Sequence, residues 1–437
     1  MTNSPLTAKT AAWLVISILS AASMGYYVAD IWSANQPPGF SDLYAPWWAA
    51  HEVLLHGRNP YSPAVAHEIQ TVIYGAPVAP SPDDPYGLGG GFAYPPYAVL
   101  LLWPTVYSSF PTAQKVFLLA SVLLTLLSLA LWLRAFRVRL SPVHWIVAAL
   151  FLLGSFPALQ ALKLQNLSLL AAALLAITIY FLAENQLVLA GIFLAASTFK
   201  PQFTVGLLPW LLLWTVADWR RRRPLALSFL VTMLLLVAVG ESLVQGWVTR
   251  FLRVISAYRH YTYGHSLLDV WFTPAFGPLA GALLLIGIMG LCWRHRSEAA
   301  GSPRFLLATS LELAATVVVI PTLAPHAQLL LLPGLLCLLP GVYNLSGFAR
   351  ILRAAAWMLL AWPWMAAFGL LVAAAWMPLI RLQRVWQLPL YTSPVLPLAV
   401  AVGLGFLVHA GSGQLNPNSP GDSTLGPNST STRNQGS

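Results

Sequence analysis

The chain has 437 residues, of which 58% are hydrophobic and only 8% are charged, and its mean hydropathy is +0.70. Soluble domains carry about 25% charged residues, so this composition excludes a water-soluble globular protein and predicts an integral membrane protein. We attribute the net charge of +10 to cytoplasmic loops rather than to nucleic-acid binding. Two cysteines are too few for a disulfide framework or a cysteine-rich metal site.

Apolar segments recur along the whole chain and predict about twelve transmembrane helices. The first covers residues 11–29, and the others begin near Thr112, Val143, Asn166, Leu187, Pro201, Leu225, Pro274, Arg304, Gln328, Ile351 and Pro394. Residues 97–110 are apolar but short and contain a proline, so we expect them to re-enter the membrane or lie at its surface. The prediction is an all-α polytopic bundle over residues 1–410, followed by a disordered polar tail at 411–437.

The distribution of charge predicts the orientation of this bundle. Arginine clusters within residues 134–139, 220–223, 294–304 and 350–353 fall on one side, which the positive-inside rule assigns to the cytoplasm. The longest loop on the opposite side covers residues 30–96 and holds six of the 13 acidic residues. Residues 43–55 of this loop are expected to form an amphipathic helix that lies on the membrane. Any chemistry that needs a carboxylate is therefore expected in this outer loop.

Five short stretches, in a fixed order, resemble a known family. They are DLYAPWWAAHEVLLHGRNPY (42–61), FAYPP (92–96), LQNLSLL (164–170), AGIFLAASTFKPQ (190–202) and APHAQLLLLP (324–333). With them the chain resembles the GT-C class of membrane glycosyltransferases. Within that class it is similar to the bacterial polyprenyl-phosphate-mannose-dependent mannosyltransferases, which include enzymes of mycobacterial phosphatidylinositol mannoside synthesis. It departs from that family at Leu164, where glycine is usual, and after His326, where an aspartate is frequent.

The resemblance implies a fold, an activity and a location. The fold would be a GT-C bundle whose first outer loop carries interfacial helices. The enzyme would transfer a sugar, mannose in the similar family, from a polyprenyl-phosphate donor to an acceptor hydroxyl by an inverting displacement. Its partners would be that donor, a glycolipid or glycan acceptor and membrane lipids. The active site would face the extracytoplasmic side of the bacterial plasma membrane, and no cofactor is implied.

Such a reaction needs a carboxylate to take the hydroxyl proton and cationic or hydrogen-bonding groups to stabilise the leaving phosphate. Asp42 is the candidate base, because it opens the outer loop and precedes the expected surface helix. The alternative is that Asp42 caps this helix. Asp30 is the rival carboxylate. Its alternative is a charged side chain that extends to the membrane interface from the end of the first span.

Four further residues are candidates for binding the donor phosphate or sugar. Lys200 lies between two short spans, where a lysine is costly unless it pairs with an anion or extends to the interface. Gln165 and Asn166 are expected at the same level, as sugar ligands or as caps of the helix that begins near Leu167. His326 is expected in a short outer turn, where it binds phosphate or sugar or serves a structural role.

Three residues of the outer loop complete the predicted site. Tyr94 and Tyr61 could stack on sugar or lipid, or belong to the aromatic belt of the membrane interface. Arg58 could contact the acceptor or the phosphate, or remain a solvated loop charge. Asp83 and Asp84 are expected to be turn residues, with a paired-carboxylate metal site as the alternative. No metal ligand is assigned, and the sequence leaves metal dependence open.

Three other functions remain open at this point. Broken helices and a deep lysine would suit a secondary transporter, although no internal repeat is visible. A non-catalytic lipid-binding protein could keep the same fold. A ligase or polymerase that uses a lipid pyrophosphate donor is the neighbouring enzyme class.

Overall fold

The computed structural model describes residues 37–262, 265–320, 325–339, 348–374 and 395–409, with isolated positions between 15 and 25 and position 376. All regular structure in this described part is helical, as predicted. The expected first span at 11–29, the rival carboxylate Asp30 and the tail at 411–437 lie largely or wholly outside the described residues. The helices of the outer loop are α2 (Tyr44–His56) and α3 (Pro63–Tyr74), with the 3₁₀ helices η1 (Pro38–Phe40), η2 (Pro96–Leu101) and η3 (Trp103–Thr105).

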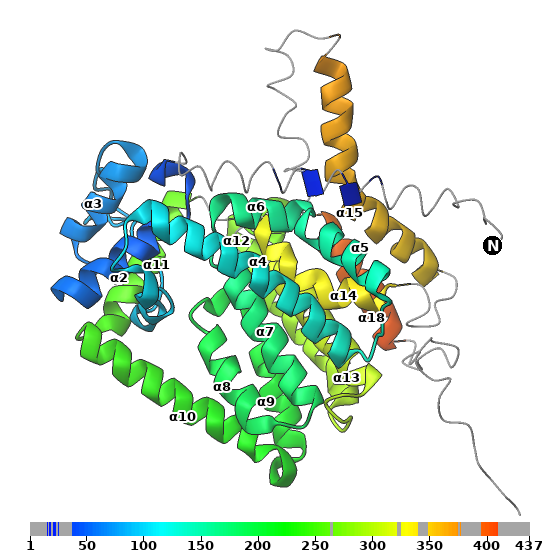
Figure 1. The fold of residues 1–437 in the computed structure, drawn as a ribbon. Coiled ribbons are helices and arrows are strands. Elements are labelled where there is room, and N and C mark those ends of the chain that lie inside the picture. The colour runs from blue at the N-terminus through cyan, green and yellow to red at the C-terminus, as the bar shows by residue number, and fades with distance from the viewer. Residues whose placement is uncertain are drawn as a thin grey trace, which may run out of the picture.

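The remaining helices form the body of the molecule (Figure 1). They are α4 (Phe110–Ala135), α5 (Pro142–Leu153), α6 (Phe156–Leu164), α7 (Ser168–Ala183), α8 (Leu187–Ser197), α9 (Leu207–Ala217), α10 (Trp219–Leu243), α11 (Trp247–Thr262), α12 (Leu267–Cys292), α13 (Pro303–Val319), α14 (Leu332–Cys337), α15 (Phe348–Ala374) and α18 (Val395–His409), with the 3₁₀ helices η4 (Pro201–Phe203), η5 (Trp293–His295) and η6 (Pro325–Leu331).

Local sequence signals explain where several of these helices begin and end. The Ser62 side chain accepts a hydrogen bond from the backbone of the first turn of α3, and a proline follows it at the first helical position. Gly57 and Gly75 end α2 and α3 with φ angles of 62° and 82°, which only glycine adopts without strain. The outer loop is therefore two capped helices joined by tight turns.

The helix α13 is the core of the body. Every residue from Phe305 to Val318 is buried, and the helix packs against α9, α12 and α18. A second close contact joins α8 to α10. There Gly191 leaves no room for a side chain, because a Cβ atom would overlap Ser228 and lie 2.5 Å from the carbonyl oxygen of Leu225. This glycine sets how closely the two helices approach.

A buried arginine fixes the junction between α9 and α10. The guanidinium of Arg222 donates to the carbonyl oxygens of Trp214 and Arg296 at 2.7 and 2.6 Å, and to those of Ser297 and Glu298 at 3.3 and 3.1 Å. It also stacks over the Trp214 ring at 3.9 Å. One side chain therefore ties three segments together at this end of the molecule.

Three described helices are long and apolar enough to cross a membrane: Phe110–Ala135, Trp219–Leu243 and the segment Leu267–His295. The bent pair α5 and α6 adds a fourth if it counts as one span. Five shorter apolar helices, of 10 to 17 residues, account for much of the remaining hydropathy. The chain is thus an all-helical membrane protein, and the number of about twelve spans stays a prediction. Residues 97–110 do not form a long helix, because η2 and η3 fill most of this stretch.

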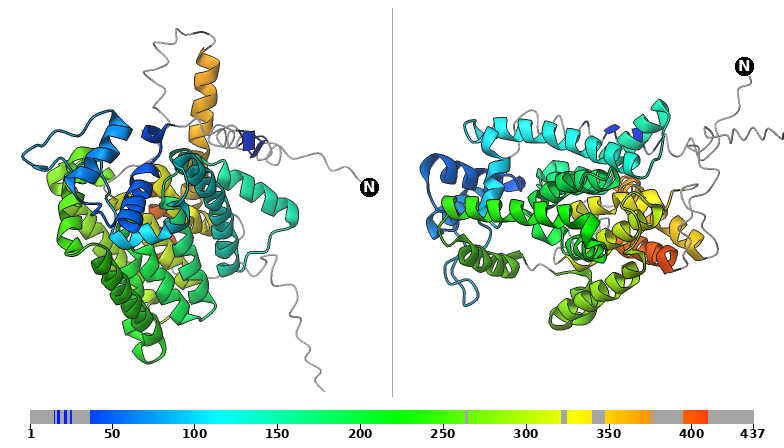
Figure 2. Two further views of the ribbon diagram at one scale, coloured as in Figure 1. Left: turned by 60° about the vertical axis from the view of Figure 1, so that its left-hand side comes forward. Right: turned by 90° about the horizontal axis from the view of Figure 1, so that it is seen from below.

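The outer loop packs at one end of the helical body. Figures 1 and 2 place α2 and α3 beside α11, with the long helix α10 along one side of the molecule. Ring contacts support this arrangement, because Tyr61 lies 6.5 Å from Phe251 of α11, between ring centroids. The start of α2 faces the turns that join α6 to α7 and α8 to η4, and the candidate residues meet there.

Candidate functional site

Asp42 is held on the turn between α6 and α7. Its backbone N–H donates to the carbonyl oxygen of Leu164 at 2.7 Å, and the neighbouring Ser41 hydroxyl donates to Gln165 Oε1 at 2.5 Å. The Asp42 side chain does not cap α2, because Leu43 occupies the cap position without a side-chain bond. Its carboxylate accepts a hydrogen bond from Asn166 Nδ2 at 2.7 Å. The alternative of a simple helix cap is therefore wrong.

Asn166 links the carboxylate to the lysine. Its Oδ1 accepts from the backbone N–H of Ser168 at 2.9 Å, from the Ser168 hydroxyl at 2.6 Å and from Lys200 Nζ at 2.8 Å. Because a backbone N–H can only donate, Oδ1 must point toward Ser168, which turns Nδ2 toward Asp42. Asn166 thus bonds to the N-terminus of α7, as predicted for a cap, and also orients the carboxylate.

Lys200 is buried between α8 and η4, with a relative exposure of only 4%. Its ammonium donates to Asn166 Oδ1 and to Ser168 Oγ at 2.6 Å, and it lies 5.0 Å from the centre of the Phe203 ring. An ammonium has three N–H donors. Two are satisfied within the part of the chain that the structure describes, so one remains for an anion.

The electrostatic environment of Asp42 suits a base. Its side chain is accessible, yet protein surrounds it on most sides, and this loss of hydration raises the pKa of the carboxyl above its ordinary value. The hydrogen bond from Asn166 and the positive charge of Lys200 act in the opposite direction. A carboxyl with a raised pKa is a stronger proton acceptor than an ordinary aspartate.

Tyr94 and His326 border the same cluster. Burial and the charges of its neighbours, Asp42 among them, raise the pKa of the Tyr94 hydroxyl, which therefore lies near the carboxylate. The Tyr94 ring stacks on Phe199, with centroids 6.4 Å apart. His326, at the start of η6, is close enough to Lys200 for their charges to interact, and its buried Nδ1 has no hydrogen-bond partner among the described residues.

Gln165 has a positioning role in this arrangement. It ends α6 in the left-handed conformation, with φ of 53°, which is uncommon for a residue other than glycine. Its Oε1 accepts from Ser41 and from Gln114 Nε2, and its Nε2 donates to the Gln114 carbonyl at 3.3 Å. These contacts attach the segment that carries Asp42 to α4 and α6, so the Gln165 side chain has a structural role.

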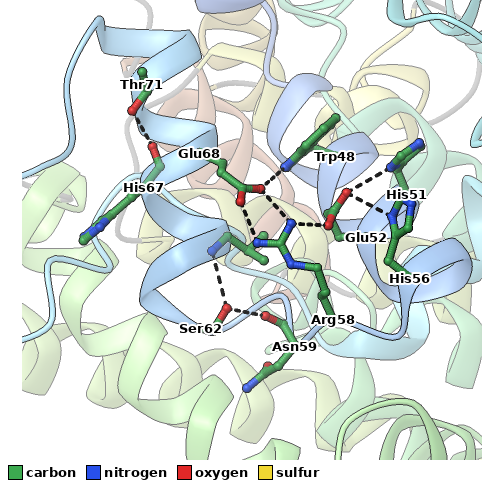
Figure 3. A network of polar contacts seen from close by, with 11 residues as sticks. Trp48, His51, Glu52, His56, Arg58, Asn59, Ser62, His67, Glu68 and Thr71 are labelled. Atoms are coloured by element: carbon green, nitrogen blue, oxygen red, sulfur yellow. Dashed lines mark hydrogen bonds and ion pairs between the residues drawn. The ribbon is translucent and has the colours of Figure 1, made fainter.

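The last two predicted residues, Tyr61 and Arg58, lie outside the hydrogen-bonded series of Asp42, Asn166 and Lys200. The Tyr61 hydroxyl donates to the carbonyl oxygen of Tyr94 at 2.6 Å and so supports the edge of the site. Arg58 follows the far end of α2 and is held by Glu52 and Glu68, each at 2.5 Å (Figure 3). The structure does not bring Arg58 into the cluster of Asp42, Asn166 and Lys200.

Sequence reasoning did not identify Ser168, Ser41 or Gln114. Ser168 follows Asn166 by two residues, and this spacing is typical of a side chain that caps a helix start. That signal could have predicted the Ser168 contact. Ser41 and Gln114 carry no such signal, because their partner Gln165 is far away in the sequence.

The arrangement combines an accessible carboxylate, a buried ammonium and an imidazole, and among the described residues one donor of the ammonium and one nitrogen of the imidazole have no partner. A carboxylate can accept a proton from a hydroxyl, while an ammonium and an imidazole can stabilise a phosphate. Aromatic rings from Tyr94, Phe199 and Phe203 surround the cluster. Such a site suits an amphiphilic substrate with an anionic group.

Comparison with known families supports a sugar-transfer role. Residues 92–321, more than half of the chain, match the family model of glycosyltransferase family 87. The matched region includes Tyr94, Gln165, Asn166 and Lys200, whereas Asp42 and His326 lie outside it. No curated protein matches the chain.

Proposed function

Because the chain belongs to glycosyltransferase family 87, we propose that it transfers a mannosyl group from a polyprenyl-phosphate donor to an acceptor hydroxyl, with Asp42 as the general base. The observation that carries this proposal is the hydrogen-bonded series Asp42, Asn166 and Lys200. It joins a proton acceptor and a phosphate-binding cation through one side chain. We place the reaction at the extracytoplasmic face of the plasma membrane, because the outer loop provides the base.

The proposed reaction is a single displacement. Asp42 takes the proton of the acceptor hydroxyl as its oxygen forms a bond to the anomeric carbon of the donor. The bond from that carbon to the phosphate oxygen breaks, and polyprenyl phosphate leaves with the electron pair. The third N–H of Lys200 and Nδ1 of His326, which have no partner among the described residues, stabilise the charge that develops on the phosphate.

A lipid donor is favoured by the position of the cation. A buried lysine among aromatic rings is costly unless a substrate anion pairs with it, and a lipid phosphate enters such a place from the side of the bilayer. Mannose and the monophosphate follow from the family that the five sequence stretches resemble. A diphosphate donor would indicate the neighbouring ligase or polymerase class instead.

The test is sugar transfer by the purified protein in lipid nanodiscs, with radiolabelled polyprenyl-phosphate-mannose and a mixed membrane-lipid acceptor. Wild type is compared with Asp42→Asn and with the matched control Asp83→Asn, which makes the same change in an exposed turn of the same loop. We expect transfer by wild type and by the control, and a loss of at least about 100-fold in Asp42→Asn, the lower range for general-base catalysis.

Folding of the inactive variant is checked by thermal unfolding. The pKa of Asp42 is raised in the folded chain, so its ionised form opposes folding at neutral pH, and a neutral amide removes that cost. We expect Asp42→Asn to unfold at the same temperature as wild type or higher. Equal transfer by Asp42→Asn and wild type would remove Asp42 as the base, and donor binding without any transfer by wild type would favour a lipid-binding protein.

A further inference from the structure

The far end of α2 carries a second cluster, separate from the proposed sugar-transfer site. His51, Glu52 and His56 each direct one possible metal ligand to a common point, and the three ligand atoms lie within 4.8 Å of one another. Glu52 Oε1 is 3.1 Å from His51 Nδ1 and 3.2 Å from His56 Nδ1. Figure 3 shows both imidazoles turned toward the same carboxylate.

We propose that His51, Glu52 and His56 bind one Zn²⁺ ion, with water as the fourth ligand. In a tetrahedral zinc site, ligand atoms about 2.0–2.1 Å from the metal are roughly 3.3 Å from one another. The two distances to Glu52 already match this spacing. The side chain that must move to complete the tetrahedral geometry is that of His56. It is 52% exposed and belongs to the last residue of α2.

The chemistry of the donors selects the metal. Two imidazoles and one carboxylate suit Zn²⁺, whereas Mg²⁺ and Ca²⁺ prefer oxygen ligands. On metal binding, each imidazole nitrogen that faces Glu52 gives up its hydrogen, and the neutral ring carries its proton on Nε2 instead. The accessible edge of His56 gives an ion a route from solvent.

A second layer of contacts holds the ligands in place. Arg58 binds the other oxygen of Glu52 and also Glu68, and Glu68 Oε2 accepts from Trp48 Nε1 at 3.1 Å. The Trp48 ring stacks on His51 at 5.2 Å with an interplanar angle of 7°. The contacts close a ring around the site, as in metal centres whose ligands are oriented by neighbouring groups (Figure 3).

The charge balance of this ring favours a cation. Glu52 and Glu68 contribute two negative charges, Arg58 contributes one positive charge, and neutral imidazoles contribute none, which leaves a net charge of one negative. The guanidinium contacts Glu52 Oε2, whereas Oε1 faces the two imidazoles on the side where the metal would bind. Arg58 therefore supports the site instead of competing for it.

The proposed ion has a structural role. The helix α2 has 13 residues and is about 20 Å long, and Asp42 precedes its start, whereas the metal site is at its end. An ion there would hold the C-terminal part of α2 together, because all three ligands belong to this helix. This inference stands whether or not the chain transfers a sugar, because it uses none of the residues of the proposed mechanism.

The test is a Zn²⁺ titration of the full-length, tag-free protein in nanodiscs after treatment with a chelator, followed by isothermal titration calorimetry. We expect one ion per chain, binding at least about tenfold weaker in His56→Ala, and unchanged binding in the control His144→Ala, which alters an exposed histidine elsewhere. Zn²⁺ should also raise the unfolding temperature of wild type but not of His56→Ala.

Any of three results would overturn the proposal. One is the absence of saturable Zn²⁺ binding by wild type. Another is unchanged affinity in both His56→Ala and a second variant, His51→Ala, which would place the ion elsewhere. Binding of Mg²⁺ as tight as that of Zn²⁺ would contradict the assignment of imidazole ligands.

Discussion

The hydrogen bond from Asn166 to Asp42 leads to a quantitative prediction for the pH dependence of sugar transfer. A general base works only when ionised, so activity is present above the pKa of Asp42 and is lost as the pH falls through it. The bond from Asn166 stabilises the ionised form and lowers a pKa that burial raises. Asn166→Leu keeps the shape of the side chain but removes this donor, so the pKa should rise further.

The size of the shift follows from the one bond of Asn166 that reaches Asp42; the contacts of Asn166 Oδ1 with Ser168 and Lys200 are lost as well, but they do not involve the carboxylate. A hydrogen bond to a charged group contributes about 1.5–3 kcal/mol, and one pKa unit corresponds to about 1.36 kcal/mol. The acid limb of the pH profile of kcat/KM should therefore move upward by about 1–2 units. The assay is mannosyl transfer measured between about pH 4.5 and 8.5.

The matched control is Ser168→Ala. It removes the contacts of the Ser168 hydroxyl with Lys200 and with Asn166 Oδ1. The bond between Asn166 Nδ2 and Asp42 stays intact, so the acid limb should stay in place. An unshifted limb in Asn166→Leu, or a shift to lower pH, would refute the reasoning. Ionisation of Asp42 would then not control the rate.

Three further predictions concern a phosphate ligand and two packing features. Lys200→Met should lower kcat of mannosyl transfer about 10²–10³-fold, because the leaving phosphate loses its cation, whereas Lys163→Met, which removes the lysine in the last turn of α6, should retain activity. Gly191→Ala should lower the free energy of unfolding by about 1–3 kcal/mol, because the added methyl group overlaps Ser228, as measured by chemical denaturation. Arg222→Lys should lower it by about 2–3 kcal/mol in the same measurement, since an ammonium cannot replace the planar fork that reaches four carbonyl groups.

Each of these changes has a control in the chain. Gly287→Ala adds the same methyl group in α12 where no atom lies within 4 Å, and it should not destabilise. Arg223→Lys alters the exposed neighbour of Arg222 and should have little effect. Equal losses in variant and control would contradict the packing explanations, and equal loss of transfer in Lys163→Met and Lys200→Met would contradict the assignment of the phosphate ligand.

The sequence predicted the helical architecture because its composition leaves few other solutions in a membrane. The family resemblance and the expected topology also placed Asp42, Asn166 and Lys200 in one predicted site, and their hydrogen bonds show that these side chains lie together. The number of spans could not be fixed in the same way. Short, proline-interrupted helices such as those on either side of Lys200 have ambiguous lengths, and hydropathy alone does not say which ones cross the bilayer.

The partners of individual side chains were less predictable. Arg58 resembled a ligand for phosphate, but two carboxylates that precede and follow it in the outer loop hold it. Gln165 resembled a sugar ligand, but its bonds to Ser41 and Gln114 depend on a chain reversal that no local pattern encodes. Side-chain chemistry was readable from the sequence, whereas the direction in which each side chain points required the tertiary structure.

The contact between Asp42 and Asn166 spans 124 residues of sequence. Asp42 is synthesised early, but its amide partner follows the five α-helices α2 to α6, and Lys200 comes later still. A partly synthesised chain therefore carries the base without the group that orients it or the cation that receives the phosphate. The cluster of Asp42, Asn166 and Lys200 is therefore complete only after the helices through α8 have been assembled, and under the proposed function no donor lipid is turned over before that point.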